Sequence, residues 1–160
     1  MRIHLAGDST GYALARELES QLGSLGHDVV WHGAPQLDEG DDYPAHSVRV
    51  GKAVIADEDS GVPVRGVLVG VSGAGEVIAV NKVAGIRAVS ATSVDVVTLA
   101  REHADVDVLT LGAAVLDAAT ALTLVIALID VPFANLLEDA RRIVNTNEFE
   151  SAGTIEGWMQ

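Results

Sequence analysis

The chain of 160 residues contains no cysteine and is poor in basic and aromatic residues. Without a thiol there is no disulfide, no thiolate nucleophile and no thiolate ligand for a metal. Ten Lys and Arg stand against 23 Asp and Glu, which gives a formal net charge of −13. Because this charge repels a polyanion and no basic cluster opposes it, nucleic acid is not expected as a partner.

Long apolar runs are also missing. The longest, residues 118–129, is about half of the roughly 20 residues that a helix needs to span a bilayer. The first ten residues, MRIHLAGDST, lack the apolar core of a signal peptide. We therefore expect one domain over residues 1–160, cytoplasmic and without membrane contact. A chain of roughly 150 residues can bury about 70% of its unfolded surface, enough for a real core.

Short runs rich in Val and Ile alternate with longer segments of helical period. Such runs are typical of parallel strands buried on both faces. Five strand–helix repeats predict an open parallel α/β sheet with helices on both faces. The predicted strands are residues 3–6, 29–31, 64–71, 86–91 and 106–111, and the predicted helices are residues 11–25, 45–56, 75–83, 93–104 and 117–129.

Two segments near the C-terminus could pack either within their own subunit or against a second one. Residues 118–129 are apolar nearly all round, which predicts a helix buried on more than one side, either in the core or at a dimer interface. After Pro132, residues 133–144 are predicted to form a sixth helix, in a C-terminal arm of about 133–150. This arm is expected to pack on its own subunit or on a partner.

The segment most suited to ligand binding is GVSGAGE, residues 70–76, between the third strand and the third helix. In such sheets ligands bind beyond the carboxyl ends of the strands. Glycines allow close backbone approach, Ser72 adds a hydroxyl and Glu76 adds a carboxylate. The loop lacks the Gly-Lys-Ser/Thr of a P-loop and the second glycine of a nucleophile elbow. A plain tight turn, with Glu76 favoured by the helix dipole, explains the pattern equally well.

Other candidates have ordinary explanations beside the catalytic ones. Asp8, after the first strand, suits an Asx turn as well as an acid–base role. His103, near the end of the fourth helix, suits a helix C-terminal cation as well as a general acid. Tyr43 lies in a loop before the second helix. The five histidines show no ligand spacing, so neither a metal site nor a cofactor is expected.

In their order and spacing these segments resemble the type B ribose-5-phosphate isomerase family, which includes the galactose-6-phosphate isomerase subunits. The resemblance covers about residues 1–145 and is most specific from Asn81-Lys82 to Arg87-Ala88. It implies a Rossmann-like three-layer α/β/α sandwich, and a homodimer or dimer of dimers with active sites at subunit interfaces. The residues that carry it are Gly7-Asp8-Ser9-Thr10-Gly11, Asp42-Tyr43-Pro44, residues 70–76, residues 79–88 and Arg101-Glu102-His103.

The resemblance further implies aldose–ketose isomerisation of a pentose phosphate, of the ribose 5-phosphate/ribulose 5-phosphate type, or of a related sugar, through a cis-enediol. Family members use either a cysteine or a glutamate as base, and the cysteine position here is Gly70, which leaves Glu76. Ser72 and the backbone of Gly73–Gly75 would face the enediolate oxygen, His103 would assist ring opening and Asp8 would handle a substrate hydroxyl. The residues expected to bind the sugar or its phosphate are Ser9, Tyr43, Gly73, Ala74, Gly75, Asn81 and Arg142.

Two arginines that bind phosphate in the family are replaced here by Ala114 and Glu138. Each lost contact is expected to cost about 1.5–3 kcal/mol of phosphate binding. The preferred hypothesis is an active sugar isomerase, with either ribose 5-phosphate, a different sugar phosphate or a sugar without phosphate as substrate. Two alternatives remain beside it. One is a partner-dependent or non-catalytic subunit, or a sugar-binding protein. The other is an unrelated small-ligand module, disfavoured because no complete G-x-G-x-x-G follows the first strand.

Overall fold

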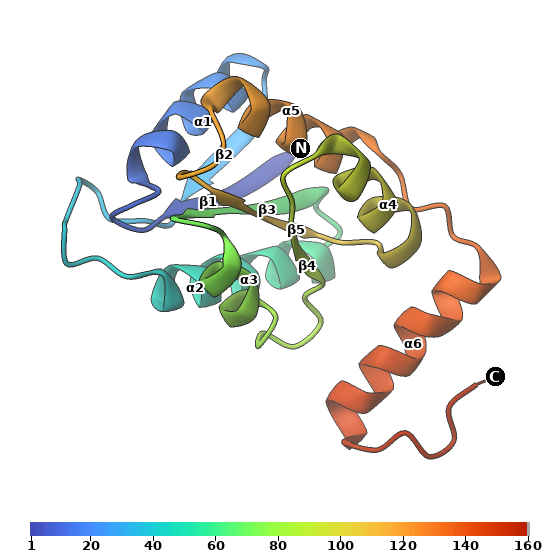
Figure 1. The fold of residues 1–160 in the computed structure, drawn as a ribbon. Helices are drawn as coiled ribbons and strands as arrows, with labels where there is room; N and C mark the ends of the chain where they lie inside the picture. Colours follow the sequence, from blue (N-terminus) through green and yellow to red (C-terminus); the bar gives the residue numbers. More distant parts are fainter. Residues whose placement is uncertain (160) are drawn as a thin grey trace.

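The computed structural model describes residues 1–159, and its centre is one fully parallel sheet. The strands lie in the order β2-β1-β3-β5-β4 (Figure 1). Each of the four connections between consecutive strands passes through a helix that returns the chain to the same edge of the sheet, as parallel pairing requires. The strands are β1 (Arg2–Gly7), β2 (Asp28–Trp31), β3 (Val64–Gly70), β4 (Ala88–Ser90) and β5 (Val108–Gly112).

Helices cover both faces of the sheet, so the chain forms the three-layer sandwich that was predicted. Three helices lie above the sheet in the view of Figure 1, namely α1 (Tyr12–Ser24), α4 (Val94–Ala104) and α5 (Ala118–Asp130). Below it lie α2 (Tyr43–Asp59) and α3 (Ala74–Val80). Each face has its own apolar core: Leu18, Leu109 and Leu124 belong to the larger one, and Val50, Leu68 and Val80 to the smaller one.

All five predicted strands and the five helices predicted to follow them are present. The boundaries shift by a few residues: α2 begins earlier and ends later than predicted, and α3 ends at Val80. Short polar side chains cap two helices, because Ser93 accepts a hydrogen bond from the Val96 N–H and Asp117 accepts one from the Thr120 N–H. No helix of residues 1–159 is long and apolar enough to cross a membrane.

The sixth helix exists, but the predicted bounds were wrong. Helix α6 runs from Leu137 to Ala152, starting four residues later than expected and ending eight residues later. The chain after Pro132 stays irregular because Asn135 has a left-handed φ of 52° and Leu136 is extended. The helix ends at Gly153, whose φ of 70° suits a residue without a Cβ. In Figure 1, α6 stands away from the sheet.

The burial of α5 is accounted for within one chain. Its residues Leu124, Val125 and Leu128 are fully buried in the larger core, which also contains residues of α1 and α4. The other apolar residues of α5, such as Leu122 and Ile126, are partly buried against the same core. The all-round apolar pattern therefore reflects a helix packed between two others on the sheet.

A network of buried charges lies where β5 begins. Asp107 is 1% exposed and accepts hydrogen bonds from the Arg87 backbone N–H at 3.1 and 3.3 Å. The Arg87 guanidinium lies 3.5 Å from the same carboxylate and donates to Asp105. Burial raises the pKa of Asp107 to about 7, against the opposing effect of Arg87. A carboxylate with a raised pKa binds more protons in the folded chain than in the unfolded one.

This raised pKa predicts a specific loss of stability with pH. Between about pH 4 and pH 7 the folded state holds a proton that the unfolded state has released, so the free energy of unfolding falls as the pH rises. In wild type, Asp107 is expected to lower the free energy of unfolding by on the order of 2–4 kcal/mol between pH 5 and pH 8. In Asp107→Asn this contribution should be absent. Chemical denaturation at both pH values measures it, with the exposed Asp95→Asn as control. An unchanged difference in Asp107→Asn would contradict the assignment.

Candidate active site

Glu76 is a buried carboxylate held against bare backbone. It lies in the first turn of α3, is 3% exposed, and has its side chain directed at Gly70, the last residue of β3. A Cβ built on Gly70 would stand 1.6 Å from Glu76 Oε1 and 2.3 Å from its carboxyl carbon. The carboxylate therefore fills the space that any other residue at position 70 would need. The Glu76 carboxylate can occupy this position because Gly70 has no side chain.

The environment of Glu76 favours its protonated form. Burial raises the pKa of Glu76, a hydrogen bond from its own backbone N–H opposes this, and the nearby carboxylates of Asp8 and Asp42 add to the increase. A carboxylate with a raised pKa is a stronger base than a solvated one, which suits a group that takes up a proton during catalysis. Such a perturbed group at the carboxyl edge of a parallel sheet marks a candidate catalytic site.

Asp8 is placed beside Glu76 by the turn that follows β1. Its backbone N–H donates to the Val69 carbonyl at 3.2 Å. Its Oδ1 accepts from the N–H groups of Thr10 and Gly11 at 2.9 and 2.8 Å, and from the Thr10 hydroxyl at 2.6 Å. Asp8 can therefore hold the Asx turn and still lie at the site, because Oδ1 accepts the hydrogen bonds of the turn and no donor from residues 1–159 bonds to Oδ2. Ser9, in the same turn, is partly exposed.

The glycine loop is supported from β5. The Thr110 hydroxyl donates to the Gly73 carbonyl at 2.8 Å, and a Cβ on Gly112 would meet the Ser72 Cα at 2.9 Å. Gly73 needs its left-handed φ of 80° to start α3 directly after the strand. Ser72 is exposed, and its hydroxyl accepts from the Ala74 N–H at 3.3 Å. The loop therefore presents Ser72 and the backbone beside the buried Glu76.

Tyr43 packs on the same loop from the first residue of α2. A Cβ on Gly75 would lie 2.7 Å from the Tyr43 Cζ, so the ring rests on bare backbone next to Glu76. Pro44 and the Asp42 carboxylate, which accepts from the Tyr43 N–H at 2.8 Å, start α2 at this point. Tyr43 is thus not in a loop, as predicted, but at a helix start. We call Asp8, Ser9, Tyr43 and residues 72–76 the Glu76 group.

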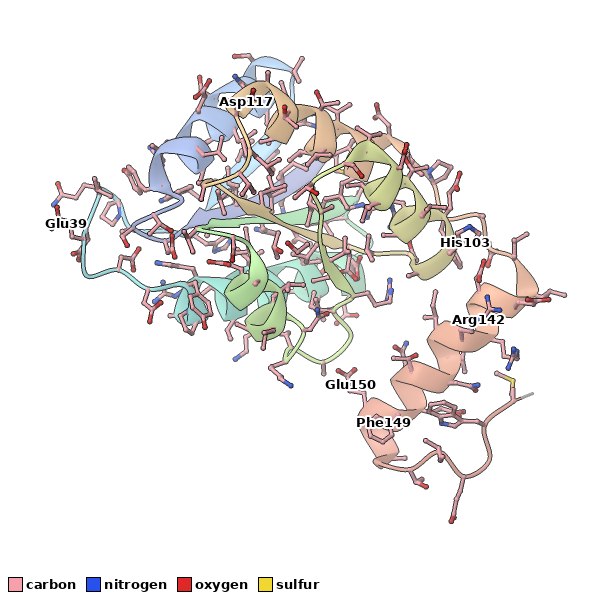
Figure 2. All side chains as sticks on the ribbon, in the orientation of Figure 1. Glu39, His103, Asp117, Arg142, Phe149 and Glu150 are labelled. Carbon is pink, nitrogen blue, oxygen red and sulfur yellow. The ribbon has the colours of Figure 1, made fainter. Side chains whose placement is uncertain are left out.

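A second group of predicted site residues meets at the junction of α4 and α6, the His103 group, made of His103, Asp139 and Arg142. His103 Nδ1 lies 2.9 Å from Asp139 Oδ2, and Arg142 Nη1 donates to Asp139 Oδ1 at 2.6 Å. Figure 2 shows His103 and Arg142 close together across this junction. The Arg142 Nη2 also donates to Glu138 at 3.2 Å. The guanidinium is therefore already paired with two carboxylates.

One chain does not bring the two groups together. Helix α4 starts after β4, at the carboxyl edge of the sheet, and returns to the beginning of β5. Its 11 residues span about 16 Å, so His103 in its last turn lies at the amino edge. Glu76 follows Gly70 and lies at the carboxyl edge. The parallel topology thus places the predicted residues at opposite edges of the sheet.

Asn81 belongs to neither group by its contacts. Its amide donates to the carbonyls of Val77 and Ala88 at 2.9 and 3.1 Å and accepts from the Ala88 N–H at 2.9 Å. These bonds fasten the end of α3 to β4, a structural role. Asn81 also lines a cleft of about 370 Å³ between the sheet domain and α6, together with His103 and Arg142. Its predicted contact with the sugar stays a prediction.

Asp139 was missed by reasoning from the sequence. It is 2% exposed, yet it looks like an ordinary acidic residue in the first turn of a helix. The only signal was its spacing three residues before Arg142, which allows a pair on one helical face. Ala114, at a family arginine position, lies beside the glycine loop, where its N–H donates to the Val71 carbonyl. No group of three or more acidic or histidine side chains within residues 1–159 could hold a metal ion.

The chain was compared with known proteins. The family model described as Ribose/Galactose Isomerase matches residues 3–146. The chain is 37% identical over 150 residues to ribose-5-phosphate isomerase B of Mycobacterium leprae, covering 94% of this chain and 90% of the relative. Against the same enzyme of Escherichia coli it is 36% identical over 115 residues, covering 71% of this chain and 73% of the relative.

Solved structures agree with these relatives. Ribose-5-phosphate isomerase B of Clostridium thermocellum superposes with a TM-score of 0.86 at 32% identity, covering 96% of this chain and all of that one. The enzyme of Mycoplasma genitalium, solved with bound ribulose-5-phosphate, gives a TM-score of 0.86 at 28% identity, covering 94% and 97%. The match therefore spans both the Glu76 group and most of α6.

The contact between Gly70 and Glu76 predicts a strong coupling between these positions. Gly70→Ala forces a Cβ into the carboxylate, and we expect it to lower the free energy of unfolding by about 1–3 kcal/mol. Most of this loss should vanish in Gly70→Ala/Glu76→Ala, because the truncated side chain leaves the space free. Gly23→Ala, in α1 with nothing within 4 Å, is the control and should stabilise by roughly 0.4–1 kcal/mol. Additive effects in the double variant would contradict this packing.

Proposed function

The chain belongs to the ribose/galactose isomerase family, and from this premise we propose how it interconverts an aldose and a ketose of the ribose 5-phosphate/ribulose 5-phosphate type. The observation that carries the proposal is the buried Glu76 carboxylate, held against Gly70 with a raised pKa. Isomerisation through a cis-enediol needs one base that takes a proton from C2 and returns it to C1. A single carboxyl group next to the sugar chain meets that need.

Glu76 is the base of this proposal because the position that offers a thiol in other family members is Gly70. Its burial makes the carboxylate a stronger base and so favours taking the proton from the sugar, since the neutral acid is favoured in a poorly solvated site. Asp42 and Asp8 strengthen this bias by their negative charge. The catalytic carboxylate is thus tuned by desolvation first and by its acidic neighbours second.

Groups around Glu76 would handle the oxygens of the sugar. The exposed Ser72 hydroxyl and the backbone of Gly73–Gly75 face the place where the enediolate oxygen forms, and hydrogen-bond donors there stabilise the developing charge. Asp8 offers Oδ2 to a substrate hydroxyl, since its Oδ1 is occupied by the turn. Ser9, Tyr43 and Ala74 line the same side, with the Tyr43 ring as a wall.

The His103 group would complete the site of a second copy of the chain. His103 assists ring opening and Arg142 binds the phosphate in the proposed mechanism, yet both lie at the edge of the sheet opposite Glu76. A homodimer, or a dimer of dimers, that joins the two edges gives two complete sites from identical chains. Because this chain carries both groups, no second kind of chain is needed.

Phosphate binding is the weakest part of the site. Arg142 is the remaining cation at a family phosphate position, and Glu138 and Asp139 already accept its hydrogen bonds. Ala114 offers no charge at all. Phosphate must compete with two carboxylates for one guanidinium, which favours a substrate held mainly through its hydroxyl groups. Sugars with and without phosphate therefore both belong in an activity screen.

Proton exchange identifies the base and the substrate in one experiment. In heavy water, we expect wild type to exchange deuterium into C1 or C2 of an aldose or ketose from a panel of phosphorylated and free sugars. Glu76→Gln should lower this rate by at least about 100-fold, because the amide cannot carry the proton. The exposed Glu17→Gln serves as control.

NMR of the sugar measures the exchange. Undiminished exchange in Glu76→Gln would exclude Glu76 as the base. Absence of exchange with every sugar in wild type would instead favour the alternative of a subunit that needs a different partner chain, or of a sugar-binding protein.

Mixing two impaired variants tests whether the site is shared between subunits. Glu76→Gln and His103→Ala each lack one group, so each is expected to keep only residual activity as a homodimer. After unfolding and refolding together in equal amounts, half of the dimers are mixed and each holds one intact site. The mixture should recover roughly a quarter of wild-type activity. A mixture no more active than its components would place both groups in one chain or exclude one of them.

A further inference from the structure

The His103 group contains a buried carboxylate to which neither the sequence pattern nor the resemblance assigns a role. Asp139 is 2% exposed, although its two hydrogen-bonding partners, His103 and Arg142, are half or more exposed. Each of its oxygens has one partner: Oδ2 has the His103 Nδ1 at 2.9 Å and Oδ1 has the Arg142 Nη1 at 2.6 Å. A buried charge of this kind is retained only where it is fully paired.

The contact with Asp139 determines which nitrogen of His103 carries the proton. A carboxylate only accepts hydrogen bonds, so the Nδ1 of His103 must be the donor. In its neutral form the ring then keeps Nε2 free to accept a proton, and in its charged form Nε2–H can donate one. The hydrogen bond from His103 is also the main reason that the pKa of Asp139 is lowered, which keeps this residue ionised.

Asp139 also connects the elements that carry the two side chains. It lies in the first turn of α6, where the helix dipole favours a carboxylate. His103 lies in the last turn of α4, and next to it the Ala134 N–H donates to the Glu102 carbonyl at 3.1 Å. One buried carboxylate thereby holds two functional side chains from two helices in a common orientation.

We propose that Asp139 is a positioning residue, which fixes the proton of His103 on Nδ1 and holds Arg142 beside it, so that Nε2 and the guanidinium together face the substrate. The inference rests on the proposed function for its catalytic consequence, but the orientation of His103 can be tested without any activity. Asparagine is the sharpest substitution at this position. It has one acceptor oxygen and one NH₂ group. Because His103 and Arg142 face different oxygens of Asp139, one of the two would meet an NH₂ group that cannot accept its hydrogen bond.

The kinetic test uses the 160-residue chain as it assembles in solution, with the substrate identified by proton exchange. Asp139→Asn is expected to lower kcat roughly 10–100-fold, with a smaller change in KM, because proton transfer through His103 loses its orientation. His103→Ala is expected to have a low residual kcat, and adding Asp139→Asn should not lower it further, since the residue through which Asp139 affects proton transfer is gone. Asp95→Asn, an exposed aspartate in the first turn of α4, is the matched control. A loss of kcat that persists in the His103→Ala background would overturn the proposal.

The spectroscopic test separates this inference from the proposed function. In ¹⁵N-histidine-labelled wild type, ring shifts assigned by comparison with His103→Gln show which nitrogen of neutral His103 is protonated. We expect Nδ1–H in wild type and a shift toward Nε2–H in Asp139→Asn. Nε2–H in wild type would overturn the inference, even if Asp139→Asn does not fold. Nδ1–H in a chain that isomerises no sugar would uphold the positioning and reject the function.

Discussion

The site depends on the fit of one carboxylate against one glycine. Glu76 can be buried at the end of β3 only because Gly70 has no side chain, since a Cβ there would overlap the carboxylate. The rest of the Glu76 group follows from this contact. The left-handed Gly73 starts α3 early enough to direct Glu76 back at the strand, Thr110 holds the loop, and bare Gly75 lets the Tyr43 ring close the side. Glycine at positions 70 and 75 leaves room for the Glu76 carboxylate and the Tyr43 ring, and glycine at position 73 allows the turn into α3.

The topology of the sheet explains why the remaining residues stand apart. In a parallel sheet every crossover helix begins at the carboxyl edge and ends at the amino edge. Glu76 at the start of α3 and His103 at the end of α4 are therefore separated by about the length of a helix within one chain. In the proposed homodimer this separation is overcome without a second kind of chain, because one subunit supplies the carboxyl edge and its partner the amino edge.

Carboxylates control the chemistry of both groups in opposite ways. Around Glu76 the acidic neighbours and poor solvation favour protonation, whereas at the α4–α6 junction the donors around Asp139 favour ionisation. At Asp107 burial is again dominant. The net charge of −13 therefore does not shift the pKa of every carboxyl group in the same direction. Its consequence for each group depends on burial and on the donors that the fold places next to it.

The sequence by itself determined the class of fold, the order of the elements and most members of the Glu76 group. These follow from local patterns: apolar runs of strand length, a glycine loop before a helix, and polar residues directly after strands. The family resemblance added the reaction and the residues His103 and Arg142. The start of α6 was misplaced because Asn135 takes a left-handed conformation that composition does not reveal. Only the tertiary structure decided that Glu76 occupies the space above Gly70, that Asn81 fastens α3 to β4, and that Asp139 joins His103 to Arg142. The contact of His103 with Asp139 joins residues 36 positions apart, and the other two join α3 to a neighbouring strand. All three depend on how the elements pack rather than on local pattern.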